Sequence, residues 1–471
     1  MSDGSSRPPK RARQACEGCR RKKTRCPGEQ PACSLCVRLG QICSYDNGSR
    51  ALDPDQTVSE RLRSLESKMD MMLSGQFAFP PKHVMDKFMM LYDERCNYQP
   101  LPLFGADFAG TYEFRDQELL NAVLAIAIQL PSRPDTAFVT ESPTEYAKKA
   151  SDSVTKKLGN GGVGLSTIQT LCLLSFWEFA DGQKDRSWLH LDLALWLAQH
   201  SKLTEEPAWN VPPVELEERR RCAWSLYILG RMTGSSPKLP IVTCRFPGAT
   251  ASLLHSPESP VSEGEIIISN NIKLYDILEK VQHFAAQSNC EAGKSLWTGD
   301  SEYGSIVSAL MEYESQFPDE HRFSEHTSGN FKDDRAYWAP WFSIQFMYHA
   351  ILCILNHPFL LAIRLEPIKE SSPRTFKQTT ADLAKLHSYW AFRFTSVAKE
   401  FGYAVTDPLI AYAVTVAATI FDHYRLSPET QARRDARDKF IKCLAFVREI
   451  GKVWPIAAQM VRPLILVAYP F

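Results

Sequence analysis

The chain has 471 residues, of which 44% are hydrophobic and 23% charged, a composition typical of globular proteins and unlike that of a disordered chain. Its length exceeds what a single hydrophobic core usually organises, so we expect two or more domains. The net charge is zero, yet residues 1–50 carry eleven Lys or Arg against four acidic residues, a net of +7, which leaves −7 for the remainder. A basic head on an acidic body predicts a polyanion-binding N-terminal end.

The N-terminus is basic and polar and has no apolar core of a secretory signal. We take 119–130 and 464–471 as the most apolar stretches, and both are shorter than the roughly 20 residues that a membrane span needs. We therefore expect an intracellular protein without a membrane partner, in which thiols stay reduced. Thirteen cysteines in such a chain indicate metal binding or burial rather than disulfides.

Six of the cysteines fall within 28 residues: Cys16, Cys19, Cys26, Cys33, Cys36 and Cys43. Each cysteine of the first half recurs 17 residues later. Thiolates bind zinc tetrahedrally, four to an ion, so six cysteines fit two Zn²⁺ ions that share two bridging sulfurs. The repeat makes Cys16 and Cys33 the natural bridging pair. The other seven cysteines stand singly, mostly among apolar neighbours, and are predicted to be buried hydrophobic residues.

Residues 15–26, followed by Pro31, Ala32, Cys33 and Cys36, resemble the fungal Zn2Cys6 binuclear cluster family. The resemblance implies that Cys16, Cys19, Cys26 and Cys33 bind one zinc ion, and that Cys16, Cys33, Cys36 and Cys43 bind the other. We assign the cluster to residues 16–43 and a basic arm to residues 1–15. The arm is predicted to act as a nuclear localisation signal, as a phosphate-binding segment, or as both.

Five cations lie between the second and third ligands: Arg20, Arg21, Lys22, Lys23 and Arg25. A run of this kind is often only a solvated basic face, but here the metal ligands would fix its orientation on a short helix. Such cations contribute salt-dependent phosphate contacts, and Lys or Arg can read guanine in the major groove. The resemblance implies that Lys22 and Lys23 read a CGG triplet and that Arg20 and Arg25 contact phosphates. Zinc-dependent protein binding is the alternative.

Residues 44–56 have the composition of a linker, and Thr57 with Glu60 forms a capping box that predicts a helix over 57–74. The apolar residues of this helix follow spacings of 4, 3, 4 and 3, as in a coiled-coil seam of about two heptads. They are Val58, Leu62, Leu65, Met69 and Met72. A helix packed on the next domain would show the same pattern. The position after a binuclear cluster matches the family's usual order and favours a short coiled coil and a homodimer.

Residues 80–471 show helical periodicity and little that resembles strands. A capping box at 142–145 predicts a helix that Gly159 closes. Further helices are predicted over 168–180, 188–202, 214–232, 265–287, 304–316, 338–356, 378–401, 409–424 and 433–450, the first two of these as an αα-hairpin. The stretches 167–171, 194–203 and 219–231, with a weaker echo at 348–359, resemble the fungal transcription factor middle homology domain. The expected fold is therefore a small metal-stabilised Zn2Cys6 module, a short coiled coil and a large all-α regulatory domain.

The body carries none of the sequence motifs of a phosphate loop, a zinc protease or a serine hydrolase, so we expect no enzymatic activity. His190, His349, His357 and His387 are isolated on apolar helical stretches and are predicted to be hydrogen-bonded core histidines. The aromatic run of Tyr337, Trp338, Trp341 and Phe342 is predicted to be core rather than a cofactor site. Helical cores can also hold ligand pockets, so binding of a small-molecule effector of unknown identity is an open alternative.

The features together predict a nuclear, sequence-specific regulator of RNA polymerase II transcription that binds CGG-containing sites and acts on the transcription machinery. Family habit favours a pathway-specific regulator of a secondary-metabolite gene cluster, with nutrient or carbon catabolism as the alternative. A cofactor that uses its zinc cluster to bind proteins is the remote alternative.

Overall fold

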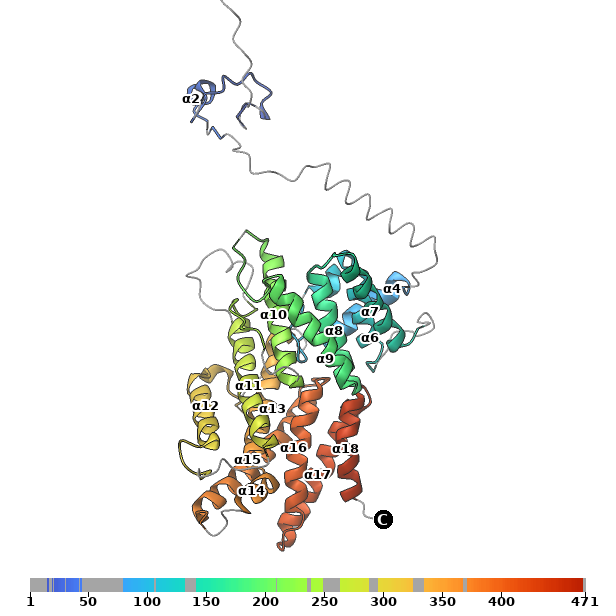
Figure 1. The fold of residues 1–471 in the computed structure, drawn as a ribbon, viewed down its shortest axis with the longest axis vertical. Coiled ribbons are helices and arrows are strands. Elements are labelled where there is room, and N and C mark those ends of the chain that lie inside the picture. Colours follow the sequence, from blue (N-terminus) through green and yellow to red (C-terminus); the bar gives the residue numbers. More distant parts are fainter. Residues whose placement is uncertain are drawn as a thin grey trace, which may run out of the picture. The chain divides into compact units, whose positions relative to one another are not determined.

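The computed structural model in Figure 1 describes residues 15–16, 19, 21–29, 31–41, 43–44, 79–105, 107–131, 141–208, 210–234, 239–248, 263–287, 295–324, 334–366 and 371–468. Every regular element within these ranges is a helix. The chain divides into two compact units, Met1–Phe79 and Pro80–Phe471. The predicted dimerisation seam at 57–74 and almost all of the basic arm lie outside the described residues.

Among the described residues, the first half of the larger unit contains six long α-helices and two short helical turns. They are α4 (Lys82–Arg95), α6 (Gln117–Ala127), α7 (Pro143–Gly159), α8 (Leu165–Asp181), α9 (Lys184–His200) and α10 (Pro213–Thr233), with α5 (Phe108–Thr111) and the 3₁₀ turn η1 (Tyr112–Phe114) between α4 and α6. The predicted capping box is present at α7, where the Glu145 N–H donates to Ser142 Oγ and the Ser142 N–H donates to the Glu145 carboxylate. Gly182 ends α8 in the left-handed conformation, which glycine adopts without steric penalty.

The second half begins after residue 262 and is also helical. Its elements are α11 (Glu263–Ala286), α12 (Glu302–Gln316), η4 (Asp319–His321), α13 (Arg335–Leu355), α14 (Pro358–Leu365), α15 (Arg374–Glu400), α16 (Pro408–Tyr424), α17 (Thr430–Gly451) and α18 (Pro455–Ala468). The ten helices predicted from the sequence are all present, each end within four residues. The prediction missed α4, α6, α14 and α18. Helix α6 is buried at ten of its eleven positions, and the sequence analysis treated this segment only as an apolar stretch.

Helix α13 lies at the centre of the second half, where it packs against α11, α15 and α16 (Figure 1). Helices α8 and α9 pack along each other, which confirms the predicted αα-hairpin. The continuous segment Arg335–Leu365 is long and apolar enough to cross a membrane by length and composition, and 56% of its most apolar window is buried in the protein. The sequence analysis was therefore wrong to treat 119–130 and 464–471 as the most apolar stretches. The apolarity of α13 is consistent with its position as a core helix.

The resemblance motif at 219–231 lies on α10, and its arginines hold neighbouring segments in place. Arg221 is buried and donates to Tyr98 Oη at 3.2 Å and to the carbonyls of Pro102 and Phe104 at 3.3 Å. Arg220 makes two hydrogen bonds to the carboxylate of Glu206, at 2.7 and 3.0 Å. The recognisable part of this motif therefore has a structural role, because buried guanidinium groups satisfy loop carbonyls that would otherwise lack donors.

The four histidines of the body that were predicted to be hydrogen-bonded core residues do form hydrogen bonds. His190 Nδ1 lies 2.7 Å from Glu178 Oε2, and His357 Nε2 lies 2.8 Å from Thr419 Oγ1. The interpretation as isolated residues was wrong for His349 and His387, whose Nδ1 atoms are 2.9 Å apart. These two residues are 38 positions apart on different helices, so only the packing of α13 against α15 brings them together.

The aromatic run on α13 divides between core and surface. Trp341 and Phe342 are almost completely buried, which agrees with the core prediction. Tyr337 and Trp338 are half-buried and line a hollow together with four acidic residues. Six of the seven cysteines outside the cluster are buried, as expected for hydrophobic packing, and the seventh, Cys290, is outside the described residues.

Candidate metal centre and nucleic-acid interface

The 17-residue repeat of the smaller unit is also a repeat of backbone structure. In the first half, the Thr24 N–H donates to the Cys19 carbonyl at 3.1 Å; in the second half, the Gln41 N–H donates to the Cys36 carbonyl at 3.0 Å. Before each donor stands a residue with positive φ, Lys23 at 52° and Gly40 at 60°. Each half is thus a short helical turn that is ended by a left-handed residue.

The second of these turns is helix α2, Ser34–Arg38. Cys33 is its N-cap, and the Cys33 sulfur accepts a hydrogen bond from the Cys36 N–H at 3.5 Å. The Ser34 N–H donates to Glu29 Oε2 at 2.7 Å, so a carboxylate satisfies another free amide at this helix end. Because the helix caps and the metal ligands are the same residues, the local fold and the metal centre depend on each other.

The sulfur atoms have the separations that tetrahedral zinc requires. A Zn–S bond of about 2.3 Å gives about 3.8 Å between two sulfurs on one ion. The Cys16 sulfur lies 3.7 Å from that of Cys33, 3.6 Å from that of Cys36 and 3.8 Å from that of Cys26. Cys19 lies 3.7 Å from Cys33. These contacts fit zinc coordination and exclude S–S bonds, which are about 2.0 Å long.

The cysteines form two overlapping sets of four, each with all sulfurs within 4.8 Å of one another. One set is Cys16, Cys19, Cys26 and Cys33, and the other is Cys16, Cys33, Cys36 and Cys43. The shared members are Cys16 and Cys33, the bridging pair that the sequence repeat indicated. Cys19 and Cys36 belong to different sets yet lie 3.9 Å apart, so the six sulfurs form one compact cluster rather than two separate sites.

Hydrogen bonds favour ionisation of the two bridging thiols. The Cys19 N–H lowers the pKa of Cys16, and the Cys36 N–H lowers the pKa of Cys33. Burial raises the pKa of Cys19 to about 12, so the terminal ligands need cations nearby before they can lose their protons. Two Zn²⁺ ions held by six thiolates supply that charge, and the resident group is a two-zinc cluster.

The cations of the first half are exposed to solvent wherever the structure describes them. Arg21, Lys22, Lys23 and Arg25 are all exposed, and Arg20 lies outside the described residues. Arg21 still belongs to the helical turn, whereas Lys22 and Lys23 form the turn that ends it. The structure thus brings these side chains together on the segment between two zinc ligands.

The second half carries different side chains at the equivalent positions. Seventeen residues beyond Lys22 and Lys23 stand Leu39, which is 54% exposed, and Gly40. Zinc coordination by the second half therefore needs no lysine at either position. The matching residue of Arg21 is the exposed Arg38 of α2, a cation that the sequence analysis missed and that the 17-residue repeat could have identified.

Two family models match the chain. Residues 14–52 match the fungal Zn(2)-Cys(6) binuclear cluster domain, and residues 103–246 match the fungal specific transcription factor domain. The second match begins in the loop that contains Phe104, whose carbonyl accepts from Arg221, and it ends after α10 at Phe246. No solved structure is significantly similar to the chain.

Curated relatives are similar over short segments only. An 80-residue segment is 38% identical to the citrinin biosynthesis transcriptional activator mrl3 of Monascus ruber and covers 16% of each chain. A 74-residue segment is 36% identical to the depudecin biosynthesis cluster-specific transcription activator DEP6 of Alternaria brassicicola, covering 15% of this chain and 12% of the relative. The regulatory protein CAT8 of Saccharomyces cerevisiae is 40% identical over 73 residues, 15% of this chain and 5% of its own.

The zinc-ligand geometry and the two domain matches agree with each other. Both matches are to domains of transcription factors rather than of enzymes. The chain therefore combines a Zn2Cys6 binuclear cluster domain with a fungal-specific transcription factor domain.

Proposed function

We propose that the protein is a nuclear, sequence-specific regulator of RNA polymerase II transcription that binds CGG-containing DNA as a homodimer. The observation that carries the proposal is the difference between the two halves of the cluster. Both halves supply three cysteines and the same backbone turn, yet only the first presents lysines at the end of that turn. A requirement beyond zinc binding explains these lysines, and a DNA duplex supplies the complementary negative charge.

The proposed reading assigns base contacts to Lys22 and Lys23 and phosphate contacts to Arg20 and Arg25. The two lysines stand at the end of the helical turn, where their ammonium groups can donate to O6 and N7 of guanine. Arg21 and the newly noted Arg38 are exposed and basic, and they are further candidates for phosphate contacts.

One cluster reads only a few base pairs, which is too little to select a site in a genome. A second copy must therefore contribute, and we assign dimerisation to the seam of Val58, Leu62, Leu65, Met69 and Met72. Two heptads make a weak zipper, so dimerisation should be completed on DNA, where both clusters share one duplex. The linker 44–56 would set the accepted spacing between triplets.

For the target genes we propose a secondary-metabolite biosynthetic cluster. The support is that relatives with 36–38% identity over short segments are named as activators of citrinin and depudecin biosynthesis. Mapping the genomic sites of the protein in its native host tests this assignment. Binding confined to genes of nutrient uptake or carbon metabolism would replace it with the catabolic alternative.

Gel-shift titration with full-length, zinc-loaded protein tests the base reading. Lys22→Ala should weaken binding to a paired CGG site by about 1–3 kcal/mol and relax discrimination at the contacted bases. Arg25→Ala should weaken specific and scrambled DNA alike and flatten the salt dependence. Equal losses on both DNAs for both variants would contradict the assignment, and binding to a protein partner without any DNA binding would favour the cofactor alternative.

The dimer assignment has its own test. Replacing Leu62 and Leu65 with Ser should leave the zinc content intact, abolish tight binding to paired triplets and change binding to a single triplet little. If the double variant binds the paired site as tightly as the parent, the seam does not mediate dimerisation.

A further inference from the structure

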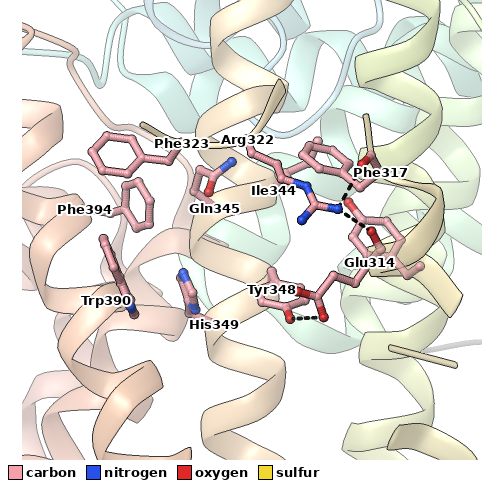
Figure 2. A pocket seen from close by; sticks show the side chains of 11 residues that line it. Glu314, Phe317, Arg322, Phe323, Ile344, Gln345, Tyr348, His349, Trp390 and Phe394 are labelled. Atoms are coloured by element: carbon pink, nitrogen blue, oxygen red, sulfur yellow. Dashed lines mark hydrogen bonds between the residues drawn. The ribbon is translucent and has the colours of Figure 1, made fainter. Parts of the chain in front are cut away.

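A pocket of about 200 Å³ opens between α12, α13 and α15 in the larger unit. Its walls are mainly aromatic: Tyr313, Phe317, Phe323, Tyr348, Trp390 and Phe394. Figure 2 shows Trp390, Phe394 and Phe323 on one side, and Tyr348, Glu314 and Arg322 on the other, with His349 and Gln345 between them. Aromatic faces that line a cavity from opposite sides suit a flat ring.

The aromatic wall is fixed by its own contacts. The ring of His349 stacks on Trp390 at 6.0 Å with 11° between the planes, and on Phe394 at 5.7 Å with 23°. Burial lowers the pKa of His349 to about 3 and that of its partner His387 to about 4, so both imidazoles are neutral at neutral pH. This wall therefore presents stacked, uncharged rings to a ligand.

The polar side chains of the pocket differ in how many hydrogen bonds and ion pairs they form within the protein. Arg322 donates to the backbone carbonyls of Glu314 at 2.8 Å and Phe317 at 3.3 Å, and it forms an ion pair with Asp319 at 3.1 Å. Tyr348 donates its hydroxyl to Glu314 Oε2 at 3.3 Å. Gln345 is only 9% exposed and belongs to the pocket lining. Its amide can both donate and accept, so it can form a hydrogen bond with a polar group of a ligand in the pocket.

The charge around the pocket disfavours anions. Arg322 is opposed by Glu314 and Asp319. A second hollow of about 570 Å³ shares Arg322 and Phe323 with the pocket and is also lined by the carboxylates Glu263, Asp319, Glu320 and Asp334. The linings of the two hollows together contain five carboxylates and one cation, so a negatively charged ligand would be repelled.

We propose that this pocket binds an uncharged, planar aromatic molecule of one or two rings that carries a hydroxyl group. The ring system lies against Trp390 and Phe394, and the hydroxyl group accepts a hydrogen bond from the Gln345 amide and donates one to the Glu314 carboxylate. The volume supports this size, since an apolar cavity of roughly 150 Å³ already holds benzene. The inference concerns the helical body alone and does not depend on which DNA site the cluster reads.

Isothermal titration of the full-length protein with 2-naphthol tests the proposal, with 2-naphthoate as the negatively charged analogue. We expect 2-naphthol to bind 1:1 with a dissociation constant of about 10–500 μM and 2-naphthoate to bind at least about tenfold more weakly. Gln345→Leu keeps the side-chain volume and should weaken 2-naphthol about fivefold. Trp390→Leu should weaken it at least about fivefold through loss of stacking.

Trp188→Leu is the matched control, because Trp188 is a partly exposed tryptophan on α9, outside the pocket lining. It should leave the affinity for 2-naphthol unchanged. Glu314→Gln alters an exposed side chain and should narrow the difference between 2-naphthol and 2-naphthoate. The proposal is overturned if 2-naphthol shows no saturable binding up to about 5 mM, about ten times the highest dissociation constant expected for a ligand of this size. It also fails if binding persists unchanged in both Gln345→Leu and Trp390→Leu, or if 2-naphthoate binds more tightly than 2-naphthol.

Discussion

Lys23 occupies a backbone conformation that suits glycine better than lysine, and replacing it separates cluster stability from DNA reading. Its φ is 52°, and the equivalent residue of the second half is Gly40 at φ 60°. The left-handed region costs an L-residue about 1–2 kcal/mol. Glycine avoids this penalty but loses about 0.5–1 kcal/mol more backbone entropy on folding. Lys23→Gly should therefore leave the cluster as stable as the parent or up to about 1.5 kcal/mol more stable.

The same substitution removes the ammonium group that we assign to a guanine. A base contact of this kind is worth about 1–3 kcal/mol, so affinity for a paired CGG site should fall about fivefold to 150-fold. Lys23→Asn makes the matched comparison, because asparagine tolerates the left-handed region and lacks the charge. Lys23→Gly and Lys23→Asn should both retain zinc as well as the parent does and should lose a similar amount of affinity for the paired CGG site.

Two titrations measure the two effects on the same protein. Competition with a chelator reports zinc retention, and gel shift reports DNA affinity. Gly40→Lys is the reverse control: a Cβ at Gly40 meets no atom within 4 Å, so only the backbone penalty of about 1 kcal/mol should appear, with no change in base preference. If Lys23→Gly loses zinc as readily as it loses DNA, Lys23 stabilises the cluster and the reasoning is wrong.

Three further predictions concern the body and the metal. Burial raises the pKa of Asp407 to about 7, so this carboxyl should cost the parent stability as the pH rises from about 4 to 7. Asp407→Asn should therefore be more stable than the parent at pH 8 by up to about 4 kcal/mol. A difference between the two in urea unfolding that does not change with pH would contradict this prediction. Arg221→Met breaks a buried ion pair with Glu217 at 2.9 Å and three hydrogen bonds and should cost about 3–5 kcal/mol in thermal unfolding, whereas the exposed Arg437→Met should cost little. Because all ten tryptophans lie beyond residue 80, chelating the zinc should abolish DNA binding and leave the tryptophan-monitored unfolding of the body unchanged; a lowered unfolding temperature would show that the two units stabilise each other.

The zinc centre could be inferred from the sequence because its ligands are local. Six cysteines within 28 residues, repeated at a spacing of 17, leave few ways to bind two tetrahedral ions, and the sulfur geometry agrees with the bridging pair chosen from the repeat. Helix positions were likewise readable, since capping boxes, glycines and a 3.6-residue period act over a few residues. Helix α6 was missed because its segment, whose polar residues lie only in the first five positions, was treated as an apolar stretch and tested only as a membrane span.

Only the tertiary structure showed which side chains from helices distant in the sequence contact one another and where a pocket lies between those helices. The sequence could mark His349 and His387 as core residues, but not that their rings meet. It could identify the α10 motif, but not that Arg221 binds loop carbonyls more than a hundred residues earlier. The aromatic pocket is a further example, because its walls come from three helices and from the segment 317–323 between two of them. The sequence identifies the chemistry of each side chain. A cavity forms where packed helices leave space between them unfilled, so its position and size depend on the tertiary packing.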